Sequence, residues 1–152
     1  MVLMAFPDAR PGREARPPER EARPVNEARD LLAACFVRSR AAGIPDERVV
    51  LDPGIGFFRD GPTPWDVRDV AVLAGLRELL ELGRPLCVGV SRKSFIGAIA
   101  GRSATAERLA GSLAATALAV ANGAALIRTH DVAETVDAVR VAERIVRAPR
   151  DA

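Results

Sequence analysis

The sequence contains little cysteine and little histidine: of 152 residues, two are cysteine and one is histidine. Cys35 and Cys87 lie far apart and form neither a C-x-x-C motif nor a Cys/His spacing, which argues against a structural zinc site and a disulfide. Both lie in apolar runs. We therefore expect two buried free thiols, which are typical of a protein of the reducing cytoplasm.

The chain also has little net charge and no clear targeting or membrane segment. Its net charge is +2 with both signs interspersed, so nothing in its overall charge predicts a nucleic-acid partner. Residues 1–6 are too few for a signal peptide and follow no basic segment. Residues 109–127 carry no charge, but they are mostly alanine and are interrupted near their end. They predict a buried helix followed by a strand rather than a membrane span.

At 152 residues, of which 49% are hydrophobic, the chain is long and apolar enough for one domain with a real core. Residues 1–5 predict a short strand. Residues 6–24 are rich in Pro, Arg, Glu and Ala, and they predict a polar, mobile loop because they have no apolar face to bury; nucleic-acid binding by this segment is the weaker alternative. Residues 25–148 form the main domain, and 149–152 form a tail.

In the main domain, glycines at regular intervals mark the ends of the helical patterns. Helical patterns end at Gly43, Gly83 and Gly123, and a short apolar run follows each. These runs, at 49–51, 86–90 and 125–127, predict buried parallel strands covered by helices, that is, an α/β fold made of βα units. Four strands are too few for a closed barrel, which takes about 250 residues. An open doubly wound sheet and one half of a (β/α)8 barrel both fit.

The helices have predicted starts and predicted buried faces. Asn26 is the expected cap of the first helix, Thr63 and Asp66 form a capping box with Pro64 at the first helical position, a third helix runs from about Ala104, and Asp131 caps the last. The expected buried stripes are Leu31, Leu32, Cys35 and Phe36 in the first helix, Val70, Leu73, Leu76 and Leu80 in the second, and Val132, Val136, Val139 and Val146 in the last.

Polar residues follow three of the strands. The first group is Asp52-Pro-Gly-Ile-Gly-Phe57, in which a carboxylate is followed by two glycines. Such a carboxylate can accept two parallel hydrogen bonds from an amidine-like ring edge, such as that of a pterin or a guanine, while the glycines let a flat ligand approach the backbone. A simple turn, in which the aspartate bonds its own backbone, fits the spacing equally well.

The second group is Ser91-Arg-Lys-Ser94, at the carboxyl end of the strand 86–90. In α/β proteins this position commonly binds anions and ring edges, for which Arg92, Lys93 and the hydroxyl and N–H of Ser94 are suited. The alternative is a solvated basic turn. Phe95 and Ile96 favour the first interpretation because they would anchor the turn against the core.

The third group is Arg128-Thr-His-Asp131, which contains the single histidine. Arg128 and His130 are two residues apart, so at an extended strand end they point the same way. Together with the start of the following helix they predict a diphosphate-binding pair; a purely structural histidine is the alternative. Because the carboxyl ends of parallel strands share one edge of a sheet, we expect the three groups to form one active-site face.

These motifs carry a family resemblance. Leu51-Asp-Pro-Gly-Ile-Gly-Phe57, Gly89-Val-Ser-Arg-Lys-Ser-Phe-Ile-Gly97 and Arg128-Thr-His-Asp-Val132 resemble the C-terminal motifs of the dihydropteroate synthase family, in order and spacing, over about residues 47–147. That family is a TIM barrel that joins 6-hydroxymethyl-7,8-dihydropterin diphosphate to 4-aminobenzoate in folate biosynthesis, with Mg²⁺ present. The resemblance implies that this chain supplies strands five to eight with their helices, a half-barrel.

The resemblance also implies roles for individual residues and for the metal. It places Asp52 on the amino edge of the pterin and Lys93 on its ring, Phe57, Ser94 and Arg92 around 4-aminobenzoate, and Arg128 and His130 on the departing diphosphate. Mg²⁺ is expected to bind through the substrate diphosphate, with its protein ligand in the family's N-terminal half, so no metal ligand is expected in this chain.

The sequence departs from the family in three places. Phe58-Arg59 stands where the family usually has Gly-Lys, and Leu3-Met4-Ala5 where it has Met-His-Met. The family's N-terminal half, with the rest of the pterin pocket, is not in this sequence. We therefore expect a transferase that acts as a homodimer or as the complement of an N-terminal half-barrel. The alternative is a non-catalytic pterin-binding fragment, the remnant of a truncated gene.

Overall fold

A computed structural model describes residues 1–6 and 23–149 of the chain. The loop predicted over residues 6–24 lies outside the described residues except at its two ends, and so do the last three residues of the predicted tail.

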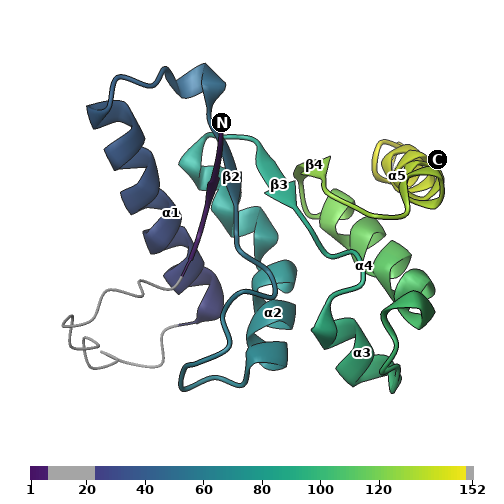
Figure 1. The fold of residues 1–152 in the computed structure, drawn as a ribbon. Coiled ribbons are helices and arrows are strands. Elements are labelled where there is room, and N and C mark those ends of the chain that lie inside the picture. Colours follow the sequence, from purple (N-terminus) through teal and green to yellow (C-terminus); the bar gives the residue numbers. More distant parts are fainter. Residues whose placement is uncertain (7–22, 150–152) are drawn as a thin grey trace.

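The core of the fold is a four-stranded parallel sheet in the order β1-β2-β3-β4. Its strands are β1 (Val2–Met4), β2 (Val50–Asp52), β3 (Leu86–Val88) and β4 (Ala124–Ile127). A doubly wound sheet reverses its strand order at a switch point, whereas this sheet adds each strand beyond the last. Successive right-handed crossovers in one direction put the helices on one face. The order therefore decides between the two predicted architectures in favour of a half-barrel (Figure 1).

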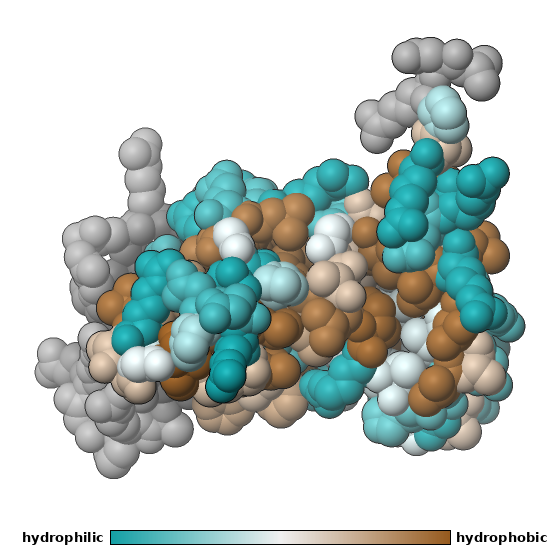
Figure 2. Space-filling view, turned by 90° about the horizontal axis from the view of Figure 1, so that it is seen from above, coloured by the Kyte–Doolittle hydropathy of each residue, from teal (hydrophilic) through white to brown (hydrophobic). Residues whose placement is uncertain are grey.

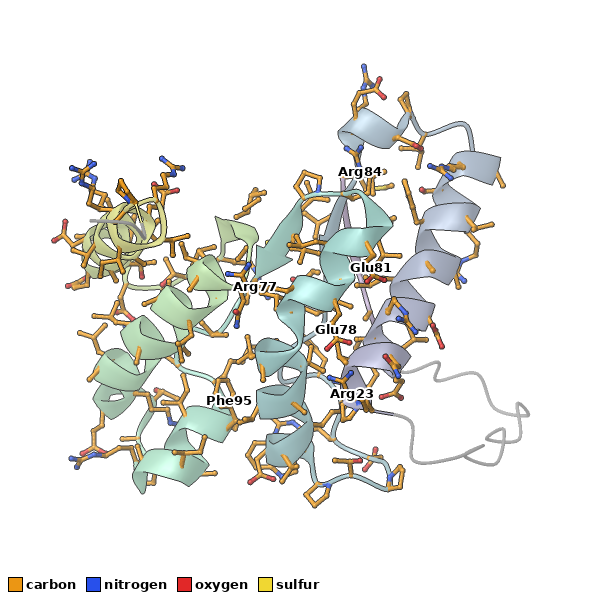
Figure 3. The ribbon with its side chains drawn as sticks, turned by 180° about the vertical axis from the view of Figure 1, so that it is seen from behind. Arg23, Arg77, Glu78, Glu81, Arg84 and Phe95 are labelled. Atoms are coloured by element: carbon orange, nitrogen blue, oxygen red, sulfur yellow. The ribbon has the colours of Figure 1, made fainter. Side chains whose placement is uncertain are left out.

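The helices follow the strands in alternation (Figure 1). They are α1 (Pro24–Ala41), α2 (Trp65–Ala74), α3 (Ser94–Ala100), α4 (Leu109–Ala121) and α5 (Val132–Val146), with short 3₁₀ helices η1 (Asp46–Arg48), η2 (Leu76–Leu82) and η3 (Thr105–Arg108). Leu32 of α1, Leu76 of η2 and Leu51 and Leu86 of the strands are fully buried together in the core. An ion pair from Arg23 Nη2 to Glu78 Oε1, 2.7 Å long, ties the start of α1 to η2 (Figure 3).

The helix starts differ from those predicted. Helix α1 begins at Pro24, two residues before Asn26, and Arg23 is its N-cap residue. Proline is well placed in a first turn, because the N–H that it lacks has no partner there. Pro64 occupies the N-cap position of α2, and Thr63 makes no capping bond there. Asp131 is the N-cap residue of α5, as predicted, but its side chain makes no capping bond. The carboxylate of Asp131 pairs with Arg92 instead.

The buried stripe predicted for the second helix is half wrong. Helix α2 ends at Ala74, and the chain continues as η2, in which the period is about 3.0 residues instead of 3.6. The buried residues are therefore Val72, Leu76 and Leu79, while Val70 and Leu80 are 42% and 40% exposed. The third predicted helix, from about Ala104, is also divided, into η3 and α4, and α3 is a further short helix before it. Phe95 and Ile96 of α3 are buried, as predicted for a turn anchored against the core.

The stripe predicted for the last helix is largely exposed. Val132 and Val146 of α5 are 63% and 47% exposed, and the helix buries Thr135 and Ala142 against α4 instead. The reason lies in β4, which is an edge strand among the described residues and whose Leu126 is 44% exposed. Among the described residues, β1 and β4 are the two edges of the sheet, each paired on one side only. Seen from above, hydrophobic side chains reach the surface in the middle of the molecule and beside α5 (Figure 2).

Residues 109–127 form α4 and then β4, as predicted, but α4 is not a buried helix, because it buries only Ser112, Thr116 and Ala119 and its Leu118 is 65% exposed. Across the described ranges, no helix is both long and apolar enough to cross a membrane. Both cysteines are free thiols; Cys87 is buried as expected, but Cys35 is only partly buried. Cys35 lies on α1, and Nη2 of Arg38, one turn later on the same helix, donates a 3.0 Å hydrogen bond to its Sγ.

Candidate active site

One cavity of about 460 Å³ lies where β3 and β4 end. Its walls come from the segment after β3, from η3 and from the segment after β4, and they consist of Gly89, Ser91, Arg92, Lys93, Thr105, Arg128, Thr129 and His130. The fold thus brings two of the three predicted polar groups to one rim. The lining combines three cationic side chains with the single histidine and two threonines, which suits an anionic ligand.

Asp52, of the first predicted group, does not line this cavity but lies next to Arg128, which does. Its side chain is 4% exposed at the end of β2, and its Oδ2 lies 4.0 Å from Arg128 Nη2. Its Oδ1 accepts the backbone N–H of Gly54 at 2.9 Å. Burial raises the pKa of Asp52, against the hydrogen bond from Gly54 and the charges of Arg128 and Lys93, which lower it. One oxygen therefore closes the turn, and the other faces the cations of the rim.

The two glycines after Asp52 allow close approaches of the backbone. Gly54 has φ +73°, and a Cβ there would lie 2.1 Å from the carbonyl oxygen of Ala5, just beyond β1. Gly56 has φ +81°, and a Cβ there would lie 2.8 Å from Cδ of Lys93. Side chains at both positions would be strained by their φ and would clash. The segment that follows β2 is thus fixed between the end of β1 and Lys93.

Lys93 is the single lysine among the 22 basic residues of the chain. Its Nζ lies 4.3 Å from the centroid of the Phe57 ring, a cation–π contact. Burial lowers the pKa of Lys93, and Arg128 and Arg59 lower it further, whereas Asp69 and Asp52 raise it. Two predicted site residues, Lys93 and Phe57, are therefore in direct contact, and the ammonium is held where its proton is easier to lose than in water.

Arg92 pairs with an acidic residue at the rim of the cavity. Its guanidinium forms a bidentate pair with Asp131, in which Nε donates to Oδ2 at 3.1 Å. Its backbone has φ 59°, a left-handed conformation that is uncommon for a residue with a side chain, and its N–H donates to Ser112 Oγ at 2.8 Å. Arg92 lines the cavity, but its charge is matched by Asp131.

His130 is oriented by Ser91, a residue that sequence reasoning did not single out. Ser91 Oγ accepts the backbone N–H of His130 at 3.2 Å and lies 3.0 Å from His130 Nδ1. A serine hydroxyl can accept this N–H and also donate its own proton to Nδ1. When Ser91 donates, the neutral ring carries its proton on Nε2, which is then a hydrogen-bond donor.

The Phe58-Arg59 departure is accommodated away from the cavity. Phe58 is 4% exposed within the core, and the guanidinium carbon of Arg68 lies 3.3 Å from its ring centroid. Arg59 stacks 4.6 Å from the Trp65 ring centroid and donates to Ser94 Oγ at 3.0 Å. The bulk of Phe58 therefore does not cover the rim, and Ser94 is bonded to a residue of the β2–α2 segment.

Sequence reasoning also missed Arg68 and Asp69, two buried charged residues on α2. Asp69 Oδ1 accepts the N–H of Gly56 at 2.9 Å, so it supports the same segment as Asp52. The signal was present in the sequence, because Asp69 precedes Val72 and Leu76 by three and seven residues. That spacing places it on the buried stripe of a helix.

Four consecutive βα units with polar residues at the carboxyl ends of the strands form one half of a (β/α)8 barrel. The sequence profile of the family described as "Pterin binding enzyme" matches residues 1–130, and the chain belongs to this family.

Similar proteins of known sequence and structure are dihydropteroate synthases. The chain is 43% identical over 122 residues to the enzyme of Neisseria meningitidis serogroup B, covering 80% of this chain and 42% of that protein. It is 43% identical over 113 residues to the Escherichia coli K12 enzyme, covering 74% of this chain and 38% of that protein. The dihydropteroate synthase of Xanthomonas albilineans in complex with 7,8-dihydropteroate superposes with a TM-score of 0.80 at 37% identity, covering 97% of this chain and 52% of that one. The chain thus spans about half the length of the relatives that it matches.

Proposed function

We propose that this chain supplies the C-terminal half of a dihydropteroate synthase active site. The proposed reaction joins 6-hydroxymethyl-7,8-dihydropterin diphosphate to 4-aminobenzoate and releases diphosphate, a step of folate biosynthesis. The observation that carries the proposal is the convergence of Lys93, Arg128 and His130 on one cavity, with Asp52 4.0 Å from Arg128. Family membership, and solved relatives that hold 7,8-dihydropteroate or 4-aminobenzoic acid, support it.

The site residues have complementary tasks in this reaction. The aryl amine forms a C–N bond to the pterin methylene as the C–O bond to diphosphate breaks, and the amine then loses a proton to solvent. Positive charge develops on the methylene and negative charge on the leaving diphosphate. Arg128 and the Nε2–H of His130 stabilise the diphosphate, and Asp52 stabilises the pterin ring as it becomes more positive.

The remaining predicted residues shape the binding site. Lys93 binds the edge of the pterin ring from the side opposite Asp52. Phe57, under the Lys93 ammonium, and Ser94, bonded to Arg59, border the 4-aminobenzoate site. Arg92, whose guanidinium pairs with Asp131, lies beside the 4-aminobenzoate site.

In this proposal, Mg²⁺ enters the site only as an ion bound to the substrate diphosphate. Among the described side chains, no group of three or more His, Cys, Asp or Glu residues converges as a metal site. The cavity lining is cationic and hydroxylic, so it fits the oxygens of a diphosphate and not a bare cation. We propose that Mg²⁺ is held by the diphosphate and by ligands outside this chain.

A second half-barrel completes the site in this proposal. Such a partner, either another copy of the chain or an N-terminal half, would pair with the edges β1 and β4 and would cover Leu126, Val132 and Val136, which are now 39–63% exposed. The proposed substrates and the two free thiols of this chain suit a protein of the cytoplasm.

Formation of dihydropteroate by the purified chain tests the proposal. Size-exclusion chromatography with light scattering separates monomer from oligomer, and each fraction is assayed with both substrates and Mg²⁺. We expect turnover in an oligomer, or when an N-terminal half is added, and its loss in Lys93→Ala. Arg48→Ala is the matched control, because it removes an exposed cation from η1, which directly precedes β2 and so lies at the amino end of the strands. Turnover that survives Lys93→Ala overturns the site assignment.

A non-catalytic pterin-binding fragment is the second candidate. It is favoured by the coverage of only 38–42% of the two relatives described above and by the open sheet edges. In this case, pterin binds but no oligomer turns over. A well-folded monomer that shows no turnover even when an N-terminal half is added would contradict the enzyme proposal and favour this one.

A further inference from the structure

Helix α2 buries a charged pair that the proposed chemistry does not use. Arg68 is 4% exposed and Asp69 is 1% exposed. Within the described part of the chain, Oδ2 of Asp69 and both terminal nitrogens of Arg68 have no hydrogen-bond partner. A buried carboxylate with an unsatisfied oxygen is costly unless nearby charges or hydrogen bonds compensate for it. The place of Asp69 in the fold indicates what this carboxylate does.

Asp69 reaches Lys93 through the backbone of Gly56. Its Oδ1 accepts the Gly56 N–H at 2.9 Å. The side chain of Lys93 lies against the same glycine, since a Cβ there would be 2.8 Å from Lys93 Cδ and 3.1 Å from Nζ. The next residue, Phe57, carries its ring 4.3 Å from that Nζ. The segment held by Asp69 therefore forms the surface on which the lysine rests.

The charges around Lys93 come from α2, from β2 and the segment after it, and from the segment after β4. Asp69 on α2 and Asp52 on β2 favour its charged form, while Arg128 after β4 and Arg59 after β2 oppose it, as does burial. Asp69 itself faces Arg68 on its own helix, Arg59 and Lys93. In the proposed reaction Asp52 is occupied by the pterin. Asp69 is then the carboxylate that remains to balance the lysine.

We propose that Asp69 is a positioning residue for Lys93, acting through the Gly56 amide and through its buried negative charge, without contact to the substrate. It fixes the turn from Gly54 to Phe57 beneath the lysine and keeps the ammonium protonated at the pterin site. The inference rests on the proposed function only for the identity of the ligand that Lys93 meets.

Two substitutions separate this role from that of a simple loop anchor. Asp69→Asn keeps an oxygen that can accept the Gly56 N–H but removes the charge. Asp69→Ala removes both. If Asp69 only anchors the loop, Asp69→Asn behaves as the wild type; if it also supports Lys93, Asp69→Asn shifts the lysine's titration. Asp66→Asn is the control, because it removes a carboxylate from the first turn of the same helix.

The single lysine makes this titration directly measurable. Incorporation of ¹³C- and ¹⁵N-labelled lysine gives one side-chain signal, that of Lys93. Followed by NMR from neutral to alkaline pH, the midpoint is expected to fall by about half a pH unit or more in Asp69→Asn, because loss of an opposite charge near an ammonium lowers its pKa. Asp66→Asn is expected to leave the midpoint unchanged. An unchanged midpoint in Asp69→Asn, with a native circular dichroism spectrum, overturns the proposal.

Binding of 6-hydroxymethylpterin, followed by its fluorescence, separates this inference from the proposed function. We expect Asp69→Asn to weaken binding more at alkaline than at neutral pH, and Asp69→Ala to weaken it at both. If the wild type binds no pterin but Asp69→Asn still shifts the lysine midpoint, Asp69 positions Lys93 and the proposed ligand is wrong. If the wild type binds pterin and Asp69→Asn changes neither the midpoint nor the binding, the positioning role is wrong.

Discussion

Arg92 and Asp131 join the two segments that enclose the candidate active site. The guanidinium of Arg92, which follows β3, meets the carboxylate of Asp131, which follows β4, with Nε 3.1 Å from Oδ2. The hydrogen bond between them lowers the pKa of Asp131 and raises the pKa of Arg92. The backbone of Arg92 is in the left-handed conformation, with φ 59°. The cavity is thus closed at one side by an ion pair between loops.

This pair predicts a pH-dependent loss of stability. The pKa of Asp131 in the folded protein lies below its ordinary value of 3.8. Its contribution is therefore fully present above 3.8 and is lost as the pH falls through the lowered pKa. Asp131→Asn should unfold at lower urea concentration than the wild type at neutral pH, and the difference should shrink in acid. Asp137→Asn, on the same helix, is the control; a difference that is constant with pH contradicts the pairing.

Asp52 predicts the opposite pH dependence. Burial raises its pKa above 3.8, so the folded state holds this proton more tightly than the unfolded state, and the stability of the protein falls as the pH rises through that window. Asp52→Asn removes the buried charge and keeps an oxygen for the Gly54 N–H. We expect a higher melting temperature at neutral pH, an advantage that disappears in acid, and loss of pterin binding. A lower melting temperature at neutral pH would show that the charge is well compensated.

Two glycines with similar backbones predict different costs on substitution. Gly54 and Gly83 have φ +73° and +68°, but a Cβ at Gly54 would lie 2.1 Å from the Ala5 carbonyl, whereas nothing lies within 4 Å of one at Gly83. Gly83→Ala should cost about 1 kcal/mol of unfolding free energy from its backbone alone. Gly54→Ala should cost about 3 kcal/mol or more, because backbone must also move. Equal urea midpoints would contradict the packing of this segment against β1.

The change from α2 to η2 predicts which of two leucines contributes more to the stability of the core. Leu76 is fully buried and Leu80 is 40% exposed, although the sequence pattern placed both on one stripe. Leu76→Ala should lower the free energy of unfolding by about 2–5 kcal/mol, and Leu80→Ala by about 1 kcal/mol or less. Similar losses of unfolding free energy for the two variants in urea denaturation would contradict the 3₁₀ segment and support the regular helix that the sequence predicted.

The strands, the glycine helix ends and the polar rim were predictable because they depend on local signals. Apolar runs bounded by Gly43, Gly83 and Gly123 place β2, β3 and β4 to within about two residues. The motifs at the strand ends follow from those strands. The sequential strand order required the structure, because local patterns do not fix which strands are neighbours.

The errors have physical causes that local patterns do not contain. A 3₁₀ segment rotated the face of the second helix, and the edge position of β4 left the valines of α5 exposed. Asp131 occupies the predicted N-cap position of α5, but its carboxylate pairs with Arg92, which is distant in sequence, and makes no capping bond. Phe58, a departure from the family pattern at the rim, packs into the core beneath Arg68. Asp69 and Ser91 act through contacts that only the folded chain forms.

The central claim is that Asp52 and Lys93 form two walls of one pterin site, and a fluorescence titration of 6-hydroxymethylpterin tests it most directly. The account predicts saturable binding by the wild type and by Arg48→Ala, and at least a tenfold weaker affinity, about 1.4 kcal/mol, in both Lys93→Ala and Asp52→Asn. Binding that Lys93→Ala leaves unchanged, or a folded wild type that binds no pterin, would contradict it.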